Sequence, residues 1–321
     1  MRDTSSPFVS VIIPAFNEGK HLPSVLAAVQ QQNYPRDRYE ILLLDNDSTD
    51  NTPAIAQKLG IQVIATTGPV SAVRNTGVRT ARGEVLAFLD ADCLPAADWL
   101  GHGIESVTAE DCVTGAPYEV PPDGSWVERA WFVQKASGRT RVKHINGGNI
   151  FITRALFDRI GGFNEHLRTG EDAEFCLRAR RAGIPVIADD SISVFHLGNP
   201  KTIRQFFRRE VWLGLGAFGT FRHAKFDKPL LGTVTFLTAT TLIGIGLILA
   251  CVRQTVSTLL VGIALLMLLL GVTLWQRRTF IKSPTHAAQL ALLYLIYFAG
   301  RSLSLAYLAT GKNYYHHNKR Q

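Results

Sequence analysis

The chain has 321 residues, enough for one large α/β domain with an appendage or for two domains. Charged residues make up only 19% of the chain, and its net charge of +8 comes entirely from the last third, because residues 228–321 hold nine Lys or Arg and no Asp or Glu. The first 227 residues carry a net charge of −1, so we expect no nucleic-acid partner. The four cysteines show no C-x-x-C spacing and are expected to be free thiols in a reducing compartment.

Short apolar segments alternate with helical segments along the first ninety residues. Apolar, β-branched runs predict strands at 8–14, 39–44, 62–65 and 84–89. Helices are expected between them at about 21–32, 52–59 and 70–81. Thr52 and Pro53 are expected to be the N-cap and the first-turn proline of the second helix. This alternation predicts βαβ units and a parallel sheet. The first apolar run is short and ends at Pro14, so it does not resemble a signal peptide.

Polar residues follow three of the predicted strands, at 17–18, 45–48 and 90–92. Because ligands bind beyond the carboxyl ends of parallel strands, we expect these residues to meet at one edge of the sheet. The first strand is not followed by G-x-G-x-x-G, and a P-loop is absent from the sequence. Asp90 and Asp92 form a D-x-D pair that suits Mg²⁺ or Mn²⁺, which leaves ligand positions free for substrate phosphates.

The last third of the chain contains three long apolar runs, at 230–252, 255–275 and 287–309. Each has the length of a membrane-spanning helix, and the first two are expected to form a hairpin. The third is interrupted by Arg301, so it either crosses as a third span or lies in the interface, and we favour the span.

Basic residues predict the orientation of these runs. Arg277, Arg278 and Lys282 place the loop before the third run, and with it the N-terminal domain, in the cytoplasm. A third span would put Lys312, Lys319 and Arg320 outside, which is the main argument for an interfacial segment.

Cationic and aromatic side chains mix at 201–225, just before the first apolar run. This composition fits a helix at the lipid headgroup level, but an ordinary amphipathic helix closing the soluble domain fits equally well. The predicted organisation is therefore a catalytic domain at 1–199, an interfacial helix or linker at 200–229, a transmembrane region at 230–311 and a basic tail at 312–321.

Five motifs occur in order in the first two hundred residues. They are PAFNE at 14–18, LLLDNDSTDNT at 42–52, VRNTGVRTARGEVLAFLDAD at 73–92, NGGNIFITR at 146–154 and GGFNEHLRTGEDAEFCLRARRAG at 161–183. Together they resemble glycosyltransferase family 2, in a membrane-anchored form of bacterial type. The resemblance implies a GT-A fold, which is an α/β fold with a mostly parallel, Rossmann-like sheet flanked by helices. It also implies a nucleotide-sugar donor, Mg²⁺ or Mn²⁺, and inversion at the anomeric carbon.

The resemblance further assigns roles to individual residues. The donor-binding residues would be Pro14, Ala15, Glu18, Asp45, Asn46, Asp47, Arg74, Asn75, Asp90 and Ala91. The metal ligands would be Asp90 and Asp92, and His196 is a further candidate ligand, although a single His is more often structural. The acceptor site would include Gly147, Gly148, Asn149 and Glu171, the two glycines allowing close approach of the backbone to the sugar. Asp172 would be the general base, although a carboxylate at that position also suits a helix N-terminus.

Two departures from the family pattern bear on specificity. Many relatives have two successive acids where this chain has Asp45-Asn46-Asp47, which leaves the nucleotide open. The Q-x-x-R-W motif of processive synthases is incomplete, because Arg209 follows Gln205-Phe206-Phe207-Arg208.

These observations predict a membrane-anchored inverting glycosyltransferase of the plasma or inner membrane, with its catalytic domain in the cytoplasm. It would move one sugar from a nucleotide-diphosphate sugar to a hydroxyl or phosphate of a lipid or lipid-linked acceptor. A processive polysaccharide synthase and a non-catalytic membrane scaffold remain as alternatives.

Overall fold

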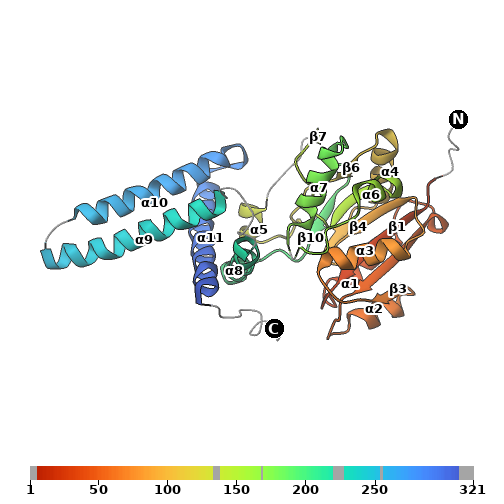
Figure 1. The fold of residues 1–321 in the computed structure, drawn as a ribbon, viewed down its shortest axis with the longest axis horizontal. Coiled ribbons are helices and arrows are strands. Elements are labelled where there is room, and N and C mark those ends of the chain that lie inside the picture. Colours follow the sequence, from red (N-terminus) through yellow and green to blue (C-terminus); the bar gives the residue numbers. More distant parts are fainter. Residues whose placement is uncertain (1–5, 133–137, 168, 220–227, 254–255, 311–321) are drawn as a thin grey trace. The chain divides into compact units, whose positions relative to one another are not determined.

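The computed structural model describes residues 6–132, 138–167, 169–219, 228–253 and 256–310 (Figure 1). The chain divides into two compact units, one of Met1–Asp123 with Gln134–Asn199 and one of Gly124–Val133 with Pro200–Gln321. Residues 124–133, which the sequence analysis assigned to the catalytic domain, thus group with the C-terminal helices.

The first unit combines strands and helices in alternation. Its strands are β1 Val9–Ala15, β2 Tyr39–Asp45, β3 Gln62–Ala65, β4 Val85–Leu89, β5 Cys93–Pro95, β6 Val113–Gly115, β7 Arg139–Arg141, β8 Asn149–Thr153, β9 Val186–Asp189 and β10 Val194–His196. Its helices are α1 Leu22–Gln30, α2 Thr52–Lys58, α3 Val70–Thr80, α4 Trp99–Ala109, α6 Arg154–Ile160 and α7 Glu171–Arg181, with a 3₁₀ turn η1 Arg36–Arg38. The predicted strands and helices of the first ninety residues are therefore confirmed to within two residues at nearly every end.

Eight strands form one sheet in the order β3-β2-β1-β4-β8-β6-β9-β7. The four strands predicted from the sequence, β3, β2, β1 and β4, are parallel to one another. The other half is mixed, because β8 runs antiparallel to both of its neighbours and β7 runs antiparallel to β9. A separate antiparallel pair joins β5 to β10.

Both faces of the sheet are buried under helices, which explains the continuous apolar runs of the central strands. Along β1, Val9, Val11 and Ile13 belong to one hydrophobic cluster, which includes the buried side of α1. Ile12 points the other way, into a second cluster that includes Phe88 of β4. Alternation along a strand thus supplies two cores, one on each face.

Thr52 has a different position from the one predicted. Asn51 is the N-cap of α2, and Thr52 is its first helical residue. The Thr52 hydroxyl accepts a hydrogen bond from the Glu18 backbone N–H at 2.8 Å, which ties the loop after β1 to the loop after β2. The residue therefore braces two loops at the edge of the sheet instead of capping its own helix.

The second unit is helical. It contains α5 Trp126–Trp131, α8 Ile203–Gly219, α9 Lys228–Arg253, α10 Ser257–Gln276 and α11 Pro284–Thr310, with a 3₁₀ turn η2 Arg278–Phe280. By length and composition, three of the described helices could cross a membrane, over Pro229–Val252, Ser257–Gln276 and Pro284–Leu308. These match the three apolar runs of the sequence.

The short helix α5 belongs to this unit through its aromatic and backbone contacts. Trp131 packs against Phe206 of α8 and Tyr294 of α11, with ring centroids 4.8 Å and 5.0 Å apart. Arg277 donates a hydrogen bond to the Trp131 carbonyl at 2.7 Å. A capping box between Ser125 and Glu128 defines the start of the helix. Helix α5 is therefore held by helices from the far end of the chain.

Two glycines of α4 give a matched test of core packing. A Cβ at Gly103 would lie 2.4 Å from ring carbons of Phe151 in β8, whereas a Cβ at Gly101 would meet nothing within 4 Å. We expect Gly103→Ala to destabilise the protein by about 1–3 kcal/mol, because the core cannot take the extra methyl group. Gly101→Ala should be neutral or stabilising by up to about 1 kcal/mol, because alanine favours the helix. Thermal unfolding of the two purified full-length variants measures the difference, and equal melting temperatures would contradict this packing.

Candidate active site

The carboxyl ends of β1, β2 and β4 meet at one edge of the sheet. Ala15 pairs with Asp45 across β1 and β2, and the Asn46 backbone N–H donates to the Ala15 carbonyl at 2.9 Å. Burial, and to a smaller extent the negative charges of Asp92, Asp90 and Asp50, together raise the pKa of Glu18 to about 7. The acid after β1 is therefore close enough to the D-x-D acids after β4 to interact with their charge.

Arg74 of α3 lies buried between two acids from distant parts of the chain. Its Nη2 contacts Asp90 Oδ1 at 2.7 Å and its Nη1 contacts Glu171 Oε1 at 2.7 Å, with 3% of the side chain exposed. Burial acts to lower the pKa of the guanidinium, but the two adjacent carboxylates outweigh it and raise the pKa above its usual value. Arg74, predicted to help hold the donor, thus fixes Asp90 relative to the start of α7.

The loop before β8 links Asp172 to Asp90. The Gly147 N–H donates to Asp172 Oδ2 at 3.1 Å, and the Gly148 N–H donates to the Tyr118 hydroxyl at 3.0 Å. Tyr118 in turn donates to Asp90 Oδ2 at 3.3 Å. The predicted general base and the first acid of the D-x-D pair are therefore held by adjacent residues of one loop.

The two glycines have a packing role that the sequence analysis did not predict. A Cβ at Gly148 would lie 2.2 Å from Asp90 Oδ2, and one at Gly147 would lie 2.8 Å from Arg74 Nη1. Both glycines thus leave room for the Arg74–Asp90 pair, and this role is independent of any contact with a sugar.

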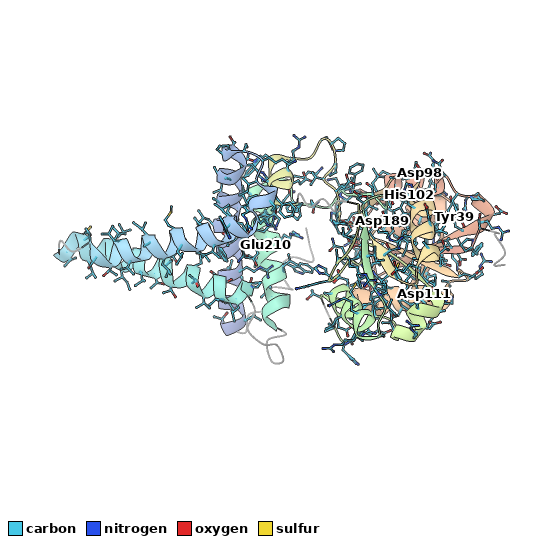
Figure 2. All side chains as sticks on the ribbon, turned by 90° about the horizontal axis from the view of Figure 1, so that it is seen from above. Tyr39, Asp98, His102, Asp111, Asp189 and Glu210 are labelled. Atoms are coloured by element: carbon cyan, nitrogen blue, oxygen red, sulfur yellow. The ribbon has the colours of Figure 1, made fainter. Side chains whose placement is uncertain are left out.

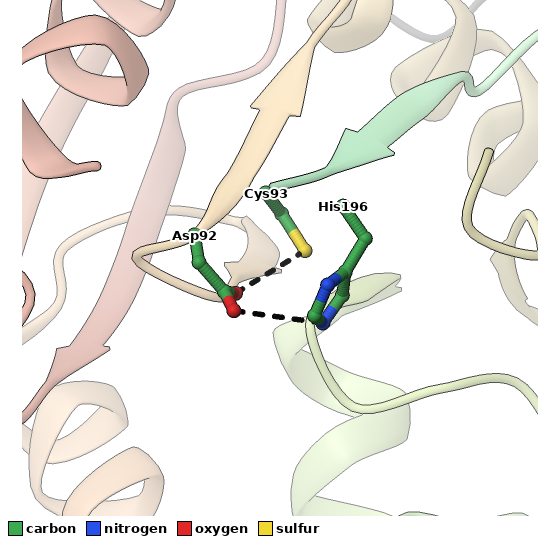
Figure 3. A group of neighbouring side chains, drawn as sticks. All are labelled: Asp92, Cys93 and His196. Carbon is green, nitrogen blue, oxygen red and sulfur yellow. Dashed lines mark hydrogen bonds and ion pairs between the residues drawn. The ribbon is translucent and has the colours of Figure 1, made fainter. Parts of the chain in front are cut away.

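Asp92, Cys93 and His196 form a compact group beside this pair (Figure 3). The antiparallel pairing of β5 with β10 sets His196 opposite Cys93. Asp92 Oδ2 lies 3.6 Å from His196 Nε2, and the Cys93 thiol lies 3.8 Å from Asp92 Oδ1. Burial raises the pKa of Asp92, His196 lowers it, and Asp90 raises it again. The pKa is raised on balance because the Asp92 carboxylate is mostly buried and lies beside a second acid.

These residues fit a divalent cation. His196 Nδ1 is buried and has no hydrogen-bond partner among the described residues. A side chain at Gly198 would come within 2.0 Å of Asp92 Oδ2, so glycine keeps that carboxylate oxygen free. The Asp92 carboxylate and the His196 imidazole offer ligands for Mn²⁺ or Mg²⁺, and the Cys93 thiol adds a ligand that Zn²⁺ prefers.

The predicted donor residues of the β2 loop differ in their availability. Asp45 Oδ1 is buried and lacks a partner among the described residues, so it remains free for a ligand. The Asn46 side chain is engaged with the Gly68 backbone through two hydrogen bonds, of 3.0 Å and 3.1 Å. Asp47 is exposed and has a φ of +63°, a conformation that non-glycine residues rarely adopt.

Pro14 and Ala15 both lie in β1, beside Leu44 and Asp45 of β2. Ala91, between the two D-x-D acids, is buried, with 2% of its surface exposed. All three predicted donor residues therefore stand at the sheet edge that carries the acids.

Two predicted site residues make hydrogen bonds within the protein through their side-chain amides. Asn149, predicted to bind the acceptor, is fully buried, and its amide group bonds Trp99, the Ala116 carbonyl and the Ile192 carbonyl. Its side chain is therefore not available to a substrate. Asn75, predicted to bind the donor, bonds the Phe163 backbone through both its oxygen and its nitrogen. It orders the loop that leads to α7.

Sequence reasoning missed two residues of this site. Tyr118 contacts Asp90 and Gly148, and its ring lies 4.7 Å from the His196 ring. It follows the short apolar strand β6, whose end joins the same edge region and could have been inspected for polar residues. Cys93 directly follows the D-x-D pair, but its orientation depends on the pairing of β5 with β10 and has no local signal.

Comparison with known proteins identifies the family of the chain. The family model described as "Glycosyl transferase family 2" matches residues 10–161, and the one described as "Glycosyl transferase family group 2" matches residues 124–307. Glycosyltransferase AglE of Haloferax volcanii is 33% identical over 210 residues, covering 60% of this chain and 68% of that protein. Beta-monoglucosyldiacylglycerol synthase of a Nostoc species is 27% identical over 187 residues, covering 52% of this chain and 40% of that protein.

Solved structures agree on the fold. Mannosyltransferase PcManGT from Pyrobaculum calidifontis, in complex with GDP-Man and Mn²⁺, superposes with a TM-score of 0.58 at 21% identity, covering 94% of this chain and 88% of that one. GalNAc-T7 with UDP, GalNAc and Mn²⁺ gives a TM-score of 0.51 at 19% identity, covering 66% of this chain and 51% of that one. The chain thus has the predicted GT-A fold, a mixed eight-stranded sheet flanked by helices and followed by three apolar helices.

Metal titration tests the proposed ligands. We expect Asp92→Asn to lower Mn²⁺ affinity by at least about tenfold. Replacing even a residue that only supports a metal ligand typically lowers metal affinity by about 10–100-fold. Cys93→Ser should leave Mn²⁺ affinity nearly unchanged and weaken Zn²⁺ binding, because sulfur is a ligand of Zn²⁺ and not of hard cations. Calorimetric titration of each purified variant with each ion gives the affinities. An unchanged Mn²⁺ affinity in Asp92→Asn would rule out Asp92 as a ligand.

Proposed function

We propose that this chain, which belongs to glycosyltransferase family 2, is a membrane-anchored inverting enzyme that transfers one sugar from a nucleotide-diphosphate sugar to a lipid or lipid-linked acceptor. The observation that carries the proposal is the joining of Asp90 and Asp172 through Gly147, Gly148 and Tyr118, with Asp92 and His196 beside them. A cation-binding group and a candidate base thus share one edge of the sheet.

The donor diphosphate would be held at the D-x-D acids. Asp90, Asp92 and His196 would bind Mn²⁺ or Mg²⁺, which when bound supplies positive charge that stabilises the departing nucleoside diphosphate. Arg74 keeps the Asp90 carboxylate in place, and Asp45, with its free buried oxygen, is suited to accept a hydrogen bond from the base or ribose. Two structural relatives hold Mn²⁺ with a nucleotide or nucleotide sugar, which supports this assignment.

Asp172 would act on the acceptor. Its carboxylate takes the proton of an acceptor hydroxyl while that oxygen attacks the anomeric carbon, and the bond from that carbon to the diphosphate breaks. The Gly147 N–H, 3.1 Å from Asp172 Oδ2, fixes the carboxylate in position. One displacement inverts the anomeric centre, so a single carboxylate near the acceptor is sufficient.

The acceptor class is inferred from the anchoring of the chain. The catalytic unit is joined to apolar helices, and one relative is named for a glycolipid product. We place the catalytic unit in the cytoplasm, because Arg277, Arg278 and Lys282 stand together between α10 and α11.

Substitution of the candidate base separates catalysis from donor binding. Asp172→Asn should lower the transfer rate by about 10²–10⁴-fold, because it removes a general base, and should leave donor affinity within about twofold. Glu174→Gln is the matched control, since Glu174 lies in the same turn of α7 but pairs with Arg178 at 2.7 Å. Radiolabelled sugar transfer and donor binding are measured for both variants. Full turnover by Asp172→Asn would exclude the assigned role.

Product length distinguishes single transfer from polymerisation. With a lipid extract as acceptor and one nucleotide sugar in excess, we expect each lipid product to gain the mass of one sugar in a mass spectrum. We expect a single transfer because the Q-x-x-R-W motif of processive synthases is incomplete at 205–209. A ladder of products that grows with time would identify a processive synthase, and the absence of metal-dependent donor turnover with every nucleotide sugar would favour a scaffold.

A further inference from the structure

The helix α11 uses its apolar surface differently from α9 and α10. In its most apolar stretch of 18 residues, 33% of the stretch is buried inside the protein, compared with 11% of the corresponding stretch in each of the other two helices. On α9 and α10, side chains such as Ile248 and Met267 are 64% and 65% exposed, whereas the exposed large apolar side chains of α11 reach 43%. The hairpin of α9 and α10 therefore requires a lipid environment much more strongly than α11 does.

The hairpin and α11 also run in different directions. Helices α9 and α10 lie side by side, and a Cβ at Gly246 of α9 would come within 2.3 Å of the Leu259 backbone of α10 (Figure 1). Both Figure 1 and Figure 2 show α11 lying across one end of this hairpin. Phe298 of α11 stacks there on Phe236 of α9, with ring centroids 5.8 Å apart. If the hairpin crosses the bilayer, a helix in this orientation lies along the membrane plane.

Helix α8 runs beside α11 in the same direction. Glu210, labelled in Figure 2, accepts hydrogen bonds from Arg301 at 3.1 Å and 3.2 Å, and the Ser304 hydroxyl donates to the Val211 carbonyl at 2.7 Å. A Cβ at Gly214 would lie 2.2 Å from the Ser304 hydroxyl oxygen, so the two helices touch closely. Contacts that advance together on both helices define a parallel pair, which must occupy the same depth in the membrane.

The outer face of α8 carries charge. Arg204, Arg208 and Trp212 are four residues apart, so they share one face, and all three are exposed. If α11 crossed the bilayer, α8 would cross with it and carry these arginines into hydrocarbon, together with the buried Glu210–Arg301 pair. At the interface the arginines meet lipid phosphates and the tryptophan ring meets the acyl boundary.

We infer that, among the described helices, only α9 and α10 cross the bilayer, and that α8 and α11 lie together in its interface as a paired surface for lipid headgroups. Lys312, Lys319 and Arg320 of the sequence then stay on the same side as Arg277, which removes the charge conflict of a third span. The inference does not depend on glycosyl transfer, and it revises the third span favoured from the sequence.

Spin-label depth is the first test. Labels on cysteines replacing Leu292 and Leu308 of α11 are compared with labels at Met267 and Trp275 of α10, all four being exposed apolar sites in full-length protein in phosphatidylglycerol and phosphatidylethanolamine vesicles. In a helix that crosses the bilayer, the two residues of each pair would differ by about 12 Å in their distance from the bilayer centre. We expect equal, shallow depths for the α11 pair and depths that differ by about 12 Å for the α10 pair. A difference of that size within the α11 pair would overturn the inference.

Thiol sidedness is the second test. Cys251 is exposed near the C-terminal end of α9, whereas Cys93, Cys112 and Cys176 are buried, so Cys251→Ser gives an unreactive background. In that background, Thr285→Cys and Thr310→Cys mark the two ends of α11. In sealed vesicles of known orientation, an impermeant maleimide should label both from one side and the native Cys251 from the other. Labelling of position 310 from the side of Cys251 would establish a third span.

Discussion

One buried guanidinium holds the candidate active site together. Arg74 comes from α3, and its two partners come from the end of β4 and from the start of α7, so a single side chain joins three elements. Without its positive charge, the partly buried Asp90 and the buried Glu171 would be two neighbouring acids with no counter-charge, and removing one partner from such an ion pair is destabilising. The same pairing leaves Asp92 as the acid whose negative charge is not matched by a buried arginine, next to His196. A divalent cation is the group that would balance it.

Around this ion pair the backbone approaches very closely, which only glycine permits. Gly148 makes room for Asp90, Gly147 for Arg74 and Gly198 for Asp92, while the amides of residues 147 and 148 bond Asp172 and Tyr118. The acids are thus positioned by main-chain groups and by sheet register, which move little. This arrangement suits a transferase, because its catalytic groups must be in place before a sugar is transferred instead of being hydrolysed.

The helical unit also contains a buried ion pair. Glu210 and Arg301 neutralise each other between α8 and α11, and the close contacts at Gly214 and Ser304 keep those helices together. Helix α5 is held by Trp131 among the aromatic rings of α8 and α11. A segment that lies between two parts of the sheet unit in the sequence therefore belongs to the helical unit.

The sequence by itself determined the elements whose signal is local. The strands and helices up to Asp92 follow from the spacing of apolar residues, and three apolar helices follow from the length of the apolar runs, of which the third is interrupted by Arg301. It also indicated the family, through motifs that each lie within one short segment. Only the tertiary structure decided which side chains are free to bind a ligand and which are engaged within the protein. It showed Asn149 bonded into the core, Arg74 buried between two acids, and Tyr118 and Cys93 beside the D-x-D pair. Those contacts join residues far apart in the chain, and strand pairing and helix packing bring them together, so no local pattern can encode them.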